Sequence, residues 1–209
     1  LVKGDDKVVL FDIQQRLVVA EAAVPGVKYV VWSDNLDRVA LLSKHSVTIA
    51  DRKLGNLLTA HETMRVKSAA WCRSGVLLYA TLNHLKYCLP NGDCGTVQTL
   101  PTPVYLTRVE GNVVHCLDRE CRARALRVDD GEYRFKLALL RRDFNEVVAL
   151  IKANRLCGQA IIAYLQQRGF PEVALHFVED AKVCFTLAVQ CGNVEVALRA
   201  AAEVDAPET

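Results

Sequence analysis

The sequence predicts an all-β segment followed by an all-α segment: a partial, WD40-like β-propeller of about three blades joined to an α-solenoid of helical hairpins. Two internal repeats carry this prediction. The pattern V-K-x-x-x-W occupies residues 27–32 and returns at 66–71, a displacement of 39 residues that is close to one propeller blade. The pattern G-x-x-E-V-A-L occupies residues 169–175 and returns at 192–198, 23 residues later. Helical units of this kind bury their apolar stripes only by stacking.

The composition is that of a globular protein. Of the 209 residues, 51% are apolar and 24% are charged, which excludes a disordered chain. The net charge of +2 gives no general attraction for nucleic acid or anionic membrane, because such binding needs a concentrated basic surface. No uncharged run reaches the roughly 18 residues that a bilayer span requires.

The β-segment is predicted from short apolar runs between residues 8 and 128. These runs are four to seven residues long and rich in Val, Leu, Tyr and Thr, which favours strands. Many are continuous rather than alternating, as expected for strands that stacked blades cover on both faces. Turn residues separate the runs at 33–35, 73–75, 90–93 and 110–112.

These turn residues divide the β-segment into blades. We predict a partial blade to about residue 24, full blades at 28–61 and 67–100, and a further partial blade at 104–128. Because closed propellers have at least about four blades, we expect the propeller to continue upstream. The absent initiator Met and a helical array without a polar capping unit predict truncation at both ends.

The apolar period changes to that of helices after residues 129–131. We therefore predict two domains, a propeller part at 1–129 and the first solenoid hairpins at 130–209. Asp143 and Glu146 have the spacing of a capping box, and Gly169 and Gly192 suit helix C-terminal caps. Pro171 suits a first helical turn. The predicted helices lie near 132–142, 144–155, 158–168, 171–179, 181–191 and 194–204.

Eight cysteines are many for this length, but none forms a C-x-x-C pair. Cys88, Cys116 and Cys184 lie singly in apolar runs. No secretory signal and no Asn-x-Ser/Thr sequon accompanies the cysteines, so we interpret them as buried thiols in a reducing cytosol rather than as a disulfide framework.

Two groups of His and Cys residues fit a structural role better than a chemical one. His115 and Cys116 with Cys121 do not have the spacing of a zinc site, which needs four converging ligands. His84 and Cys88 would lie about 13 Å apart along a strand, too far for a base and its nucleophile. Phosphate-loop and hydrolase motifs are absent. We predict no enzyme activity and no catalytic, cofactor-binding or metal-binding residue.

Two further groups of residues favour structure over ligand binding. Arg119, Arg122, Arg124 and Arg127 form a local basic cluster in which Arg122 and Arg124 share a strand face. A solvated blade edge explains the cluster better than an acidic protein or a lipid headgroup does, and nucleic acid is the least favoured because no aromatic residue is interleaved. We interpret the repeated tryptophans, at 32 and 71, as blade packing.

Four segments resemble the alpha subunit of the coatomer complex: VALLSKH at 39–45, CLDRECR at 116–122, GFPEVALHFVED at 169–180 and CGNVEVAL at 191–198. The likeness spans the whole chain. It is similar to the stretch where the second β-propeller of that family ends and its α-solenoid begins.

The resemblance implies a non-enzymatic structural subunit of the COPI vesicle coat, acting in retrograde Golgi-to-ER and intra-Golgi transport. It implies a cytoplasmic protein, peripheral on Golgi membranes and COPI-coated vesicles. The implied partners are other coatomer subunits, beta-prime and epsilon, and cargo tails with dilysine signals that bind through domains absent here. Nucleic acid is not among the implied partners. No cargo-binding residue carries over, so the partner-binding residues are unknown.

Two alternatives stay open beside the coat. One is a propeller-plus-solenoid scaffold of another assembly, of the ciliary transport or nuclear pore type. The other is a thiol-dependent enzyme that uses Cys88 or Cys116, suggested only by the number of cysteines.

Overall fold

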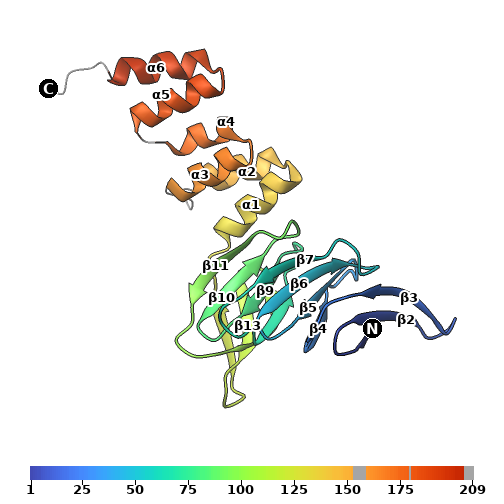
Figure 1. Ribbon diagram of the computed structural model, residues 1–209. Coiled ribbons are helices and arrows are strands. Elements are labelled where there is room, and N and C mark those ends of the chain that lie inside the picture. The colour runs from blue at the N-terminus through green and yellow to red at the C-terminus, as the bar shows by residue number, and fades with distance from the viewer. Residues whose placement is uncertain (153–158, 179, 205–209) are drawn as a thin grey trace. The chain divides into compact units, whose positions relative to one another are not determined.

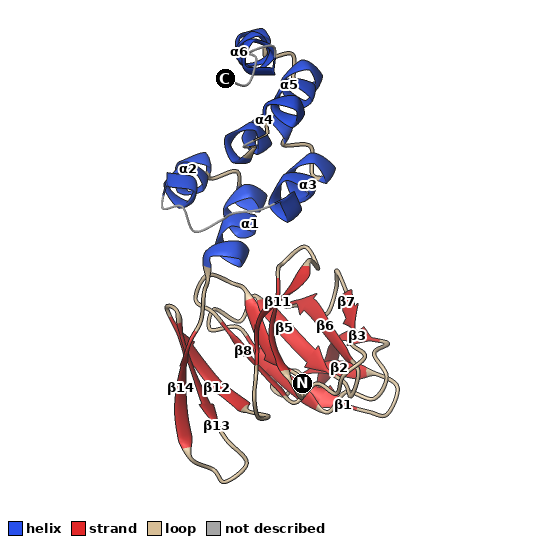
Figure 2. Cartoon of the chain, turned by 90° about the vertical axis from the view of Figure 1, so that its left-hand side faces the viewer, coloured by secondary structure: helices blue, strands red, loops and turns tan. Residues whose placement is uncertain are grey.

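The computed structural model describes residues 1–152, 159–178 and 180–204. It divides the chain into two compact units, Leu1–Leu137 and Ala138–Thr209. The last strand ends at Arg127 and the first helix begins at Gly131. The all-β then all-α prediction is confirmed (Figures 1 and 2).

Unit 1 contains four antiparallel sheets, each built from strands that are consecutive in the chain. The two outer sheets have three strands and the two middle sheets have four, in the manner of propeller blades. The first sheet comprises β1 (Val2–Lys3), β2 (Val8–Asp12) and β3 (Leu17–Ala22), and the second β4 (Tyr29–Trp32), β5 (Arg38–Leu42), β6 (Ser46–Asp51) and β7 (Leu58–His61). The third comprises β8 (Ser68–Trp71), β9 (Leu77–Ala80), β10 (His84–Cys88) and β11 (Cys94–Thr99), and the fourth β12 (Tyr105–Glu110), β13 (Val113–Leu117) and β14 (Ala123–Arg127).

The cores of unit 1 lie between successive sheets rather than within any one sheet. One buried cluster joins the first and second sheets through residues such as Val8 and Leu41. A second joins the second and third sheets, and a third joins the third and fourth sheets to the first helix. Each sheet therefore depends on its neighbour for burial of its apolar face.

The V-K-x-x-x-W repeat has the same structural role in both middle sheets. Val27 and Val66 are buried. The following lysine N–H groups donate to the next strand, from Lys28 to the carbonyl of Leu42 at 2.7 Å and from Lys67 to that of Ala80 at 2.8 Å. The tryptophans pack against the inter-sheet cores, and the indole N–H of Trp71 donates to the Val31 carbonyl of the preceding sheet at 2.9 Å. Their interpretation as blade packing is confirmed.

One type of tight turn recurs at several of the sheet hairpins. In these turns, one N–H donates to the carbonyl three residues earlier from a residue with positive φ, as at Gly75 (φ 84°) and Gly92 (φ 89°). Leu54 (φ 59°) and Cys121 (φ 59°) occupy the same position in the turns after β6 and β13. The turn at 33–35 places positive φ on Leu36, one residue beyond the predicted segment. This geometry suits three-residue hairpin loops with a G1 bulge.

Unit 2 is helical, and the helices begin close to their predicted starts. They are α1 (Gly131–Arg141, whose first residues belong to unit 1), α2 (Phe144–Lys152), α3 (Gln159–Gln167), α4 (Pro171–Ala174), the 3₁₀ turn η1 (Leu175–Phe177), α5 (Ala181–Gln190) and α6 (Val194–Val204). The predicted helix at 171–179 was too long, because the chain changes to 3₁₀ geometry at Leu175 and is extended at Val178. The predicted helical residues 153–155, 158 and 179 lie outside the described residues.

Three helix ends close with one motif. After α5, the Gly192 N–H donates to the Val189 carbonyl and the Asn193 N–H to that of Ala188, which is the Schellman pattern. The same pair of bonds follows α3 at Gly169 (φ 77°) and follows α1 at Arg142 (φ 57°). Both predicted glycine caps are confirmed. At Arg142 the motif holds a side chain in the left-handed region, which costs free energy.

The first two turns of α1 belong to the core of unit 1. Tyr133 and Leu137 are buried in the cluster between the third and fourth sheets. The hydroxyl of Tyr87 donates to the Glu132 carboxylate at 2.9 Å and accepts from Lys136 Nζ at 2.8 Å. Lys136 Nζ also pairs with Glu132 at 2.6 Å. We name these contacts of Tyr87 with Glu132, Tyr133 and Lys136 the helix anchor.

The helix anchor leaves no room for a side chain at Gly95. A Cβ there would lie 2.5 Å from the ring of Tyr87, which is buried in the third sheet. We expect Gly95→Ala to displace that ring and to lower the free energy of unfolding by about 1–3 kcal/mol. Gly4→Ala is the matched control, since its Cβ meets nothing nearer than 3.4 Å. Urea unfolding followed by circular dichroism measures both, and equal stabilities would contradict the prediction.

The recurrent helix cap predicts that two substitutions change the stability of the fold in opposite directions. Gly192→Ala forces a Cβ into φ 70° and is expected to cost about 1 kcal/mol. Arg142→Gly relieves the equivalent strain and is expected to stabilise by less than that, because glycine also loses more entropy on folding. Urea midpoints of the two variants test the pair. An Arg142→Gly protein as destabilised as Gly192→Ala would show that the Arg142 side chain, not its backbone, holds the turn.

Candidate functional site

The structure does not bring the sequence-derived metal and nucleophile candidates together. His115 and Cys116 are neighbours on β13 and so point to opposite faces of the sheet. His115 Nε2 lies 3.4 Å from the Glu110 carboxylate, while Cys121 sits exposed in the following turn. In the described part of the chain, no group of three His, Cys, Asp or Glu side chains is arranged to hold a metal ion.

His84 and Cys88 lie at opposite ends of β10. The sulfur that contacts Cys88 belongs instead to Cys94, at 2.8 Å. Cys94 does not stand out in the sequence, because no C-x-x-C spacing links it to another cysteine. The turn at 90–93 carried the needed signal, since a hairpin centred there places residue 88 opposite residue 94.

The interpretation of the cysteines as buried thiols is only partly right. The seven cysteines in the described residues are all free thiols. Cys72, Cys88 and Cys116 are buried as predicted, whereas Cys184 and Cys191 are half-buried. The prediction is wrong for Cys94 and Cys121, which are exposed because one begins the outermost strand of its sheet and the other occupies the tip of a hairpin turn. Cys157 lies outside the described residues.

The basic cluster is organised by one buried carboxylate. Asp118 is 4% exposed and its Oδ2 accepts from Nε of both Arg122 and Arg124 at 3.0 Å. The shared face predicted for these two arginines is thereby confirmed. Arg122 also pairs with Glu120 at 2.9 Å. Two of the four arginines are thus held by acidic neighbours of the same turn, as expected for a solvated blade edge.

Asp118 closes the turn between β13 and β14. Its Oδ1 accepts from the backbone N–H groups of Glu120 and Arg122, at 3.0 and 2.9 Å. The backbone hydrogen bond from Arg122 is the main cause that lowers the pKa of Asp118 to about 2; burial opposes it and the two guanidinium groups assist it. Asp51 holds the equivalent turn after β6 in the same way, and backbone hydrogen bonds from Gly55 and Lys53 lower its pKa as well.

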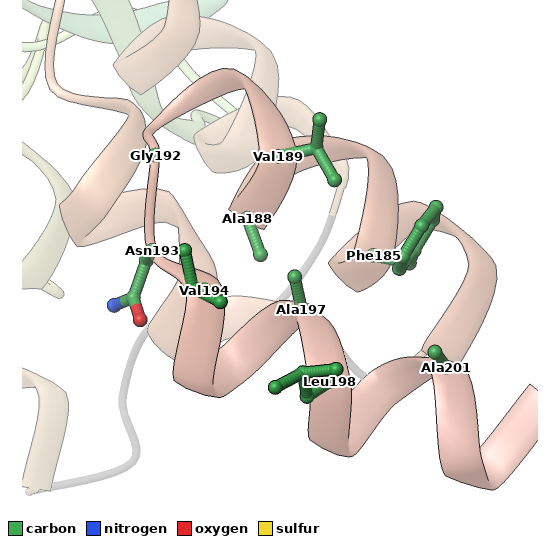
Figure 3. A pocket seen from close by; sticks show the side chains of 9 residues that line it. All are labelled: Phe185, Ala188, Val189, Gly192, Asn193, Val194, Ala197, Leu198 and Ala201. Carbon is green, nitrogen blue, oxygen red and sulfur yellow. The ribbon is translucent and has the colours of Figure 1, made fainter.

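The last helical hairpin presents an apolar groove of about 250 Å³ (Figure 3). Ala188 of α5 and Ala197 of α6 are buried between the two helices and point toward one another. Larger side chains line the open side and are exposed: Phe185, Val189, Val194 and Leu198. A stripe of this kind is what stacking of helical repeats produces, because each hairpin covers the next. The lining of the groove contains no titratable side chain.

None of the helices, over the residues that the structure describes, has both the length and the apolar character needed to cross a bilayer.

The turn at Asp118 predicts a specific pH dependence. Since its folded pKa lies below the unfolded value of about 3.9, ionised Asp118 stabilises the fold above about pH 4, and this contribution disappears as the pH falls toward about 2. Asp118→Asn should therefore be less stable than the unaltered chain at pH 6 and equal to it near pH 2. Urea unfolding at several pH values tests this, with Asp51→Asn as the matched variant. A stability difference that does not change with pH would contradict the assignment.

Comparison with known proteins gives a consistent result. Residues 1–118 match the family described as the COPA/B second beta-propeller. Coatomer subunit alpha-2 of Oryza sativa subsp. japonica is 56% identical over 205 residues, which cover 98% of this chain and 17% of that protein. Coatomer subunit alpha of Saccharomyces cerevisiae is 49% identical over 203 residues, covering 97% and 17%. The chain spans 17% of the length of these curated relatives.

Among solved structures, the computationally designed Ika4 protein has a TM-score of 0.48 and 12% identity over 60% of this chain and 81% of its own. That likeness is too slight to bear on the fold. The family match over the sheets and the identity to coatomer alpha subunits across the helices agree with one another. The chain belongs to the coatomer subunit alpha family, and residues 1–118 match the second β-propeller of that family.

Proposed function

We propose that the chain is a structural, non-enzymatic part of the COPI vesicle coat that serves retrograde Golgi-to-ER and intra-Golgi protein transport. The observation that carries the proposal is 56% identity to a coatomer alpha subunit over 98% of the chain. The likeness covers sheets and helices together. Because the identity extends over both the sheets and the helices, it favours a role that needs both parts rather than the propeller alone.

The helix anchor supports a scaffold role. Leu137 and Tyr133 are buried with residues of the third and fourth sheets, and Lys136 Nζ lies 5.5 Å from the ring centre of Tyr87. The start of α1 is therefore fixed on the sheet unit by apolar contact, hydrogen bonds and charge at once. A coat subunit needs such a fixed start for its helical arm.

We propose residues 1–129 as the propeller domain and 130–209 as the first hairpins of the solenoid. The last strand ends at Arg127 and the helices follow from Gly131, which supports this division. The apolar groove on α5 and α6 supports the solenoid assignment, because stacked hairpins bury apolar stripes of this kind against one another.

The proposal places the protein in the cytoplasm and peripherally on Golgi membranes and COPI-coated vesicles. The proposed partners are other coatomer subunits, beta-prime and epsilon. Cargo tails with dilysine signals would bind through domains that this chain does not contain. Nucleic acid is not a proposed partner, since the acidic neighbours of Arg122 and Arg124 occupy part of the basic cluster.

Affinity purification of the tagged full-length protein tests the proposal. We expect the other coatomer subunits to copurify from a cytosolic extract in stoichiometric amounts, because a scaffold binds its neighbours without turnover. Mass spectrometry of the recovered proteins is the measurement, with the same tag on an unrelated propeller protein as the control. A different stoichiometric set, of ciliary transport or nuclear pore proteins, would assign the scaffold to another assembly. Recovery of no partner would overturn the coat proposal.

A further inference from the structure

Cys88 and Cys94 face each other across the hairpin of β10 and β11. They are directly paired in the strand register. In the adjacent pair, the Leu89 N–H donates to the Asp93 carbonyl at 2.8 Å, so the cysteines fall at the neighbouring non-hydrogen-bonded position. Opposed Cα atoms at such a position are about 4.5 Å apart, which lies within the range that a disulfide spans.

The two side chains lie on the same face of the sheet. Their sulfur atoms are 2.8 Å apart, and Cys94 Sγ also lies 3.5 Å from the Gly92 carbonyl oxygen. The two thiols can therefore be joined without rearrangement of the strands. The turn itself is fixed by the Gly92 N–H, which donates to the Leu89 carbonyl at 2.9 Å.

The environments of the two thiols differ in a way that suits stepwise chemistry. Cys94 is exposed, whereas Cys88 is 1% exposed. The hydrogen bond with Cys88 is the main cause that lowers the pKa of Cys94, and burial opposes it. The same hydrogen bond and burial raise the pKa of Cys88. Burial raises the pKa of other thiols, to about 12 at Cys72 and to a lesser extent at Cys116.

A polar network from the second and third sheets surrounds the pair. The carboxylate of Glu62 accepts from the hydroxyl of Tyr79 at 2.6 Å and from Lys86 Nζ at 2.7 Å. The Tyr79 hydroxyl and the Lys86 charge favour the thiolate of Cys94, whereas the Glu62 carboxylate opposes it. The pKa of Cys94 is lowered on balance, and the residue is exposed, which are features of reactive rather than structural cysteines.

We propose that Cys88 and Cys94 form a reversible oxidation site whose co-reactant is hydrogen peroxide. The Cys94 thiolate attacks one peroxide oxygen, which becomes the hydroxyl of a sulfenic acid, while the O–O bond breaks and the other oxygen leaves and is protonated to water. The Cys88 sulfur then attacks the Cys94 sulfur. The S–O bond breaks, the departing hydroxide takes the Cys88 proton as water, and the disulfide forms.

In the overall reaction, the two thiols lose two electrons and two protons, and hydrogen peroxide gains them to give two molecules of water. A dithiol reductant reverses the oxidation by exchange. Transient disulfides of this kind are the ones found in reducing compartments, where they sense redox change. The inference goes beyond the coat function and does not depend on it.

Peptide mapping of the full-length protein tests the site. Cleavage after Lys86 and Arg108 releases residues 87–108 with both cysteines in one peptide. After stoichiometric hydrogen peroxide and alkylation, we expect this peptide to lose two hydrogens and to resist alkylation. We expect dithiothreitol to restore both thiols. The oxidation should be roughly tenfold faster than that of the exposed Cys121, which serves as the internal reference.

Single substitutions distinguish Cys94, the thiol that attacks the peroxide, from Cys88, the thiol that attacks the sulfenic acid. Cys88→Ser should leave a sulfenic acid at Cys94 that dimedone traps, whereas Cys94→Ser should leave Cys88 reduced. Cys121→Ser is the matched control and should not change the rate at Cys94. If Cys88→Ser fails to fold, the peptide map of the unaltered protein still shows whether Cys88 and Cys94 form the disulfide. Oxidation at Cys94 no faster than at Cys121, or a disulfide to a different cysteine, would overturn the proposal.

Discussion

Apolar packing between neighbouring sheets is the constraint on which unit 1 depends. Each sheet is a simple meander whose buried side chains pack against those of a neighbouring sheet, so no sheet has a core of its own. Trp71 shows the consequence at one residue, since its ring packs between the second and third sheets while its N–H bonds to Val31 of the second. The repeat of 39 residues places the same buried valine, lysine N–H hydrogen bond and packed tryptophan at two junctions, between the first and second sheets and between the second and third.

The first turns of α1 pack against the sheets in the same way as a neighbouring sheet does. Leu137 and Tyr133 complete the cluster that the third and fourth sheets begin. The start of α1 is therefore as much a part of the sheet core as a strand is. This explains why the compact unit ends at Leu137, within the helix, although the strands end at Arg127. For a proposed coat scaffold, the change of secondary structure and the change of folding unit need not coincide.

Polar groups act where the apolar packing stops. Asp118 and Asp51 close turns with backbone hydrogen bonds, and the surface arginines near Asp118 add little, since Arg122 is 66% exposed at its side chain. The proposed thiol pair occupies the same kind of place, at a hairpin end beside the network of Glu62, Tyr79 and Lys86. Reactive chemistry is compatible with a packed scaffold there, because one thiol is buried in the sheet while its partner meets solvent.

The sequence alone determined the architecture, because repeats and periodicity reflect contacts that every blade or hairpin repeats. The two tryptophans, the glycine caps at 169 and 192, and the shared face of Arg122 and Arg124 were all predictable from local spacing. Only the tertiary structure decided which cysteines are exposed and that Tyr87 holds α1 from 45 residues away. The physical reason is that such contacts join segments distant in the chain, where no sequence period connects the partners.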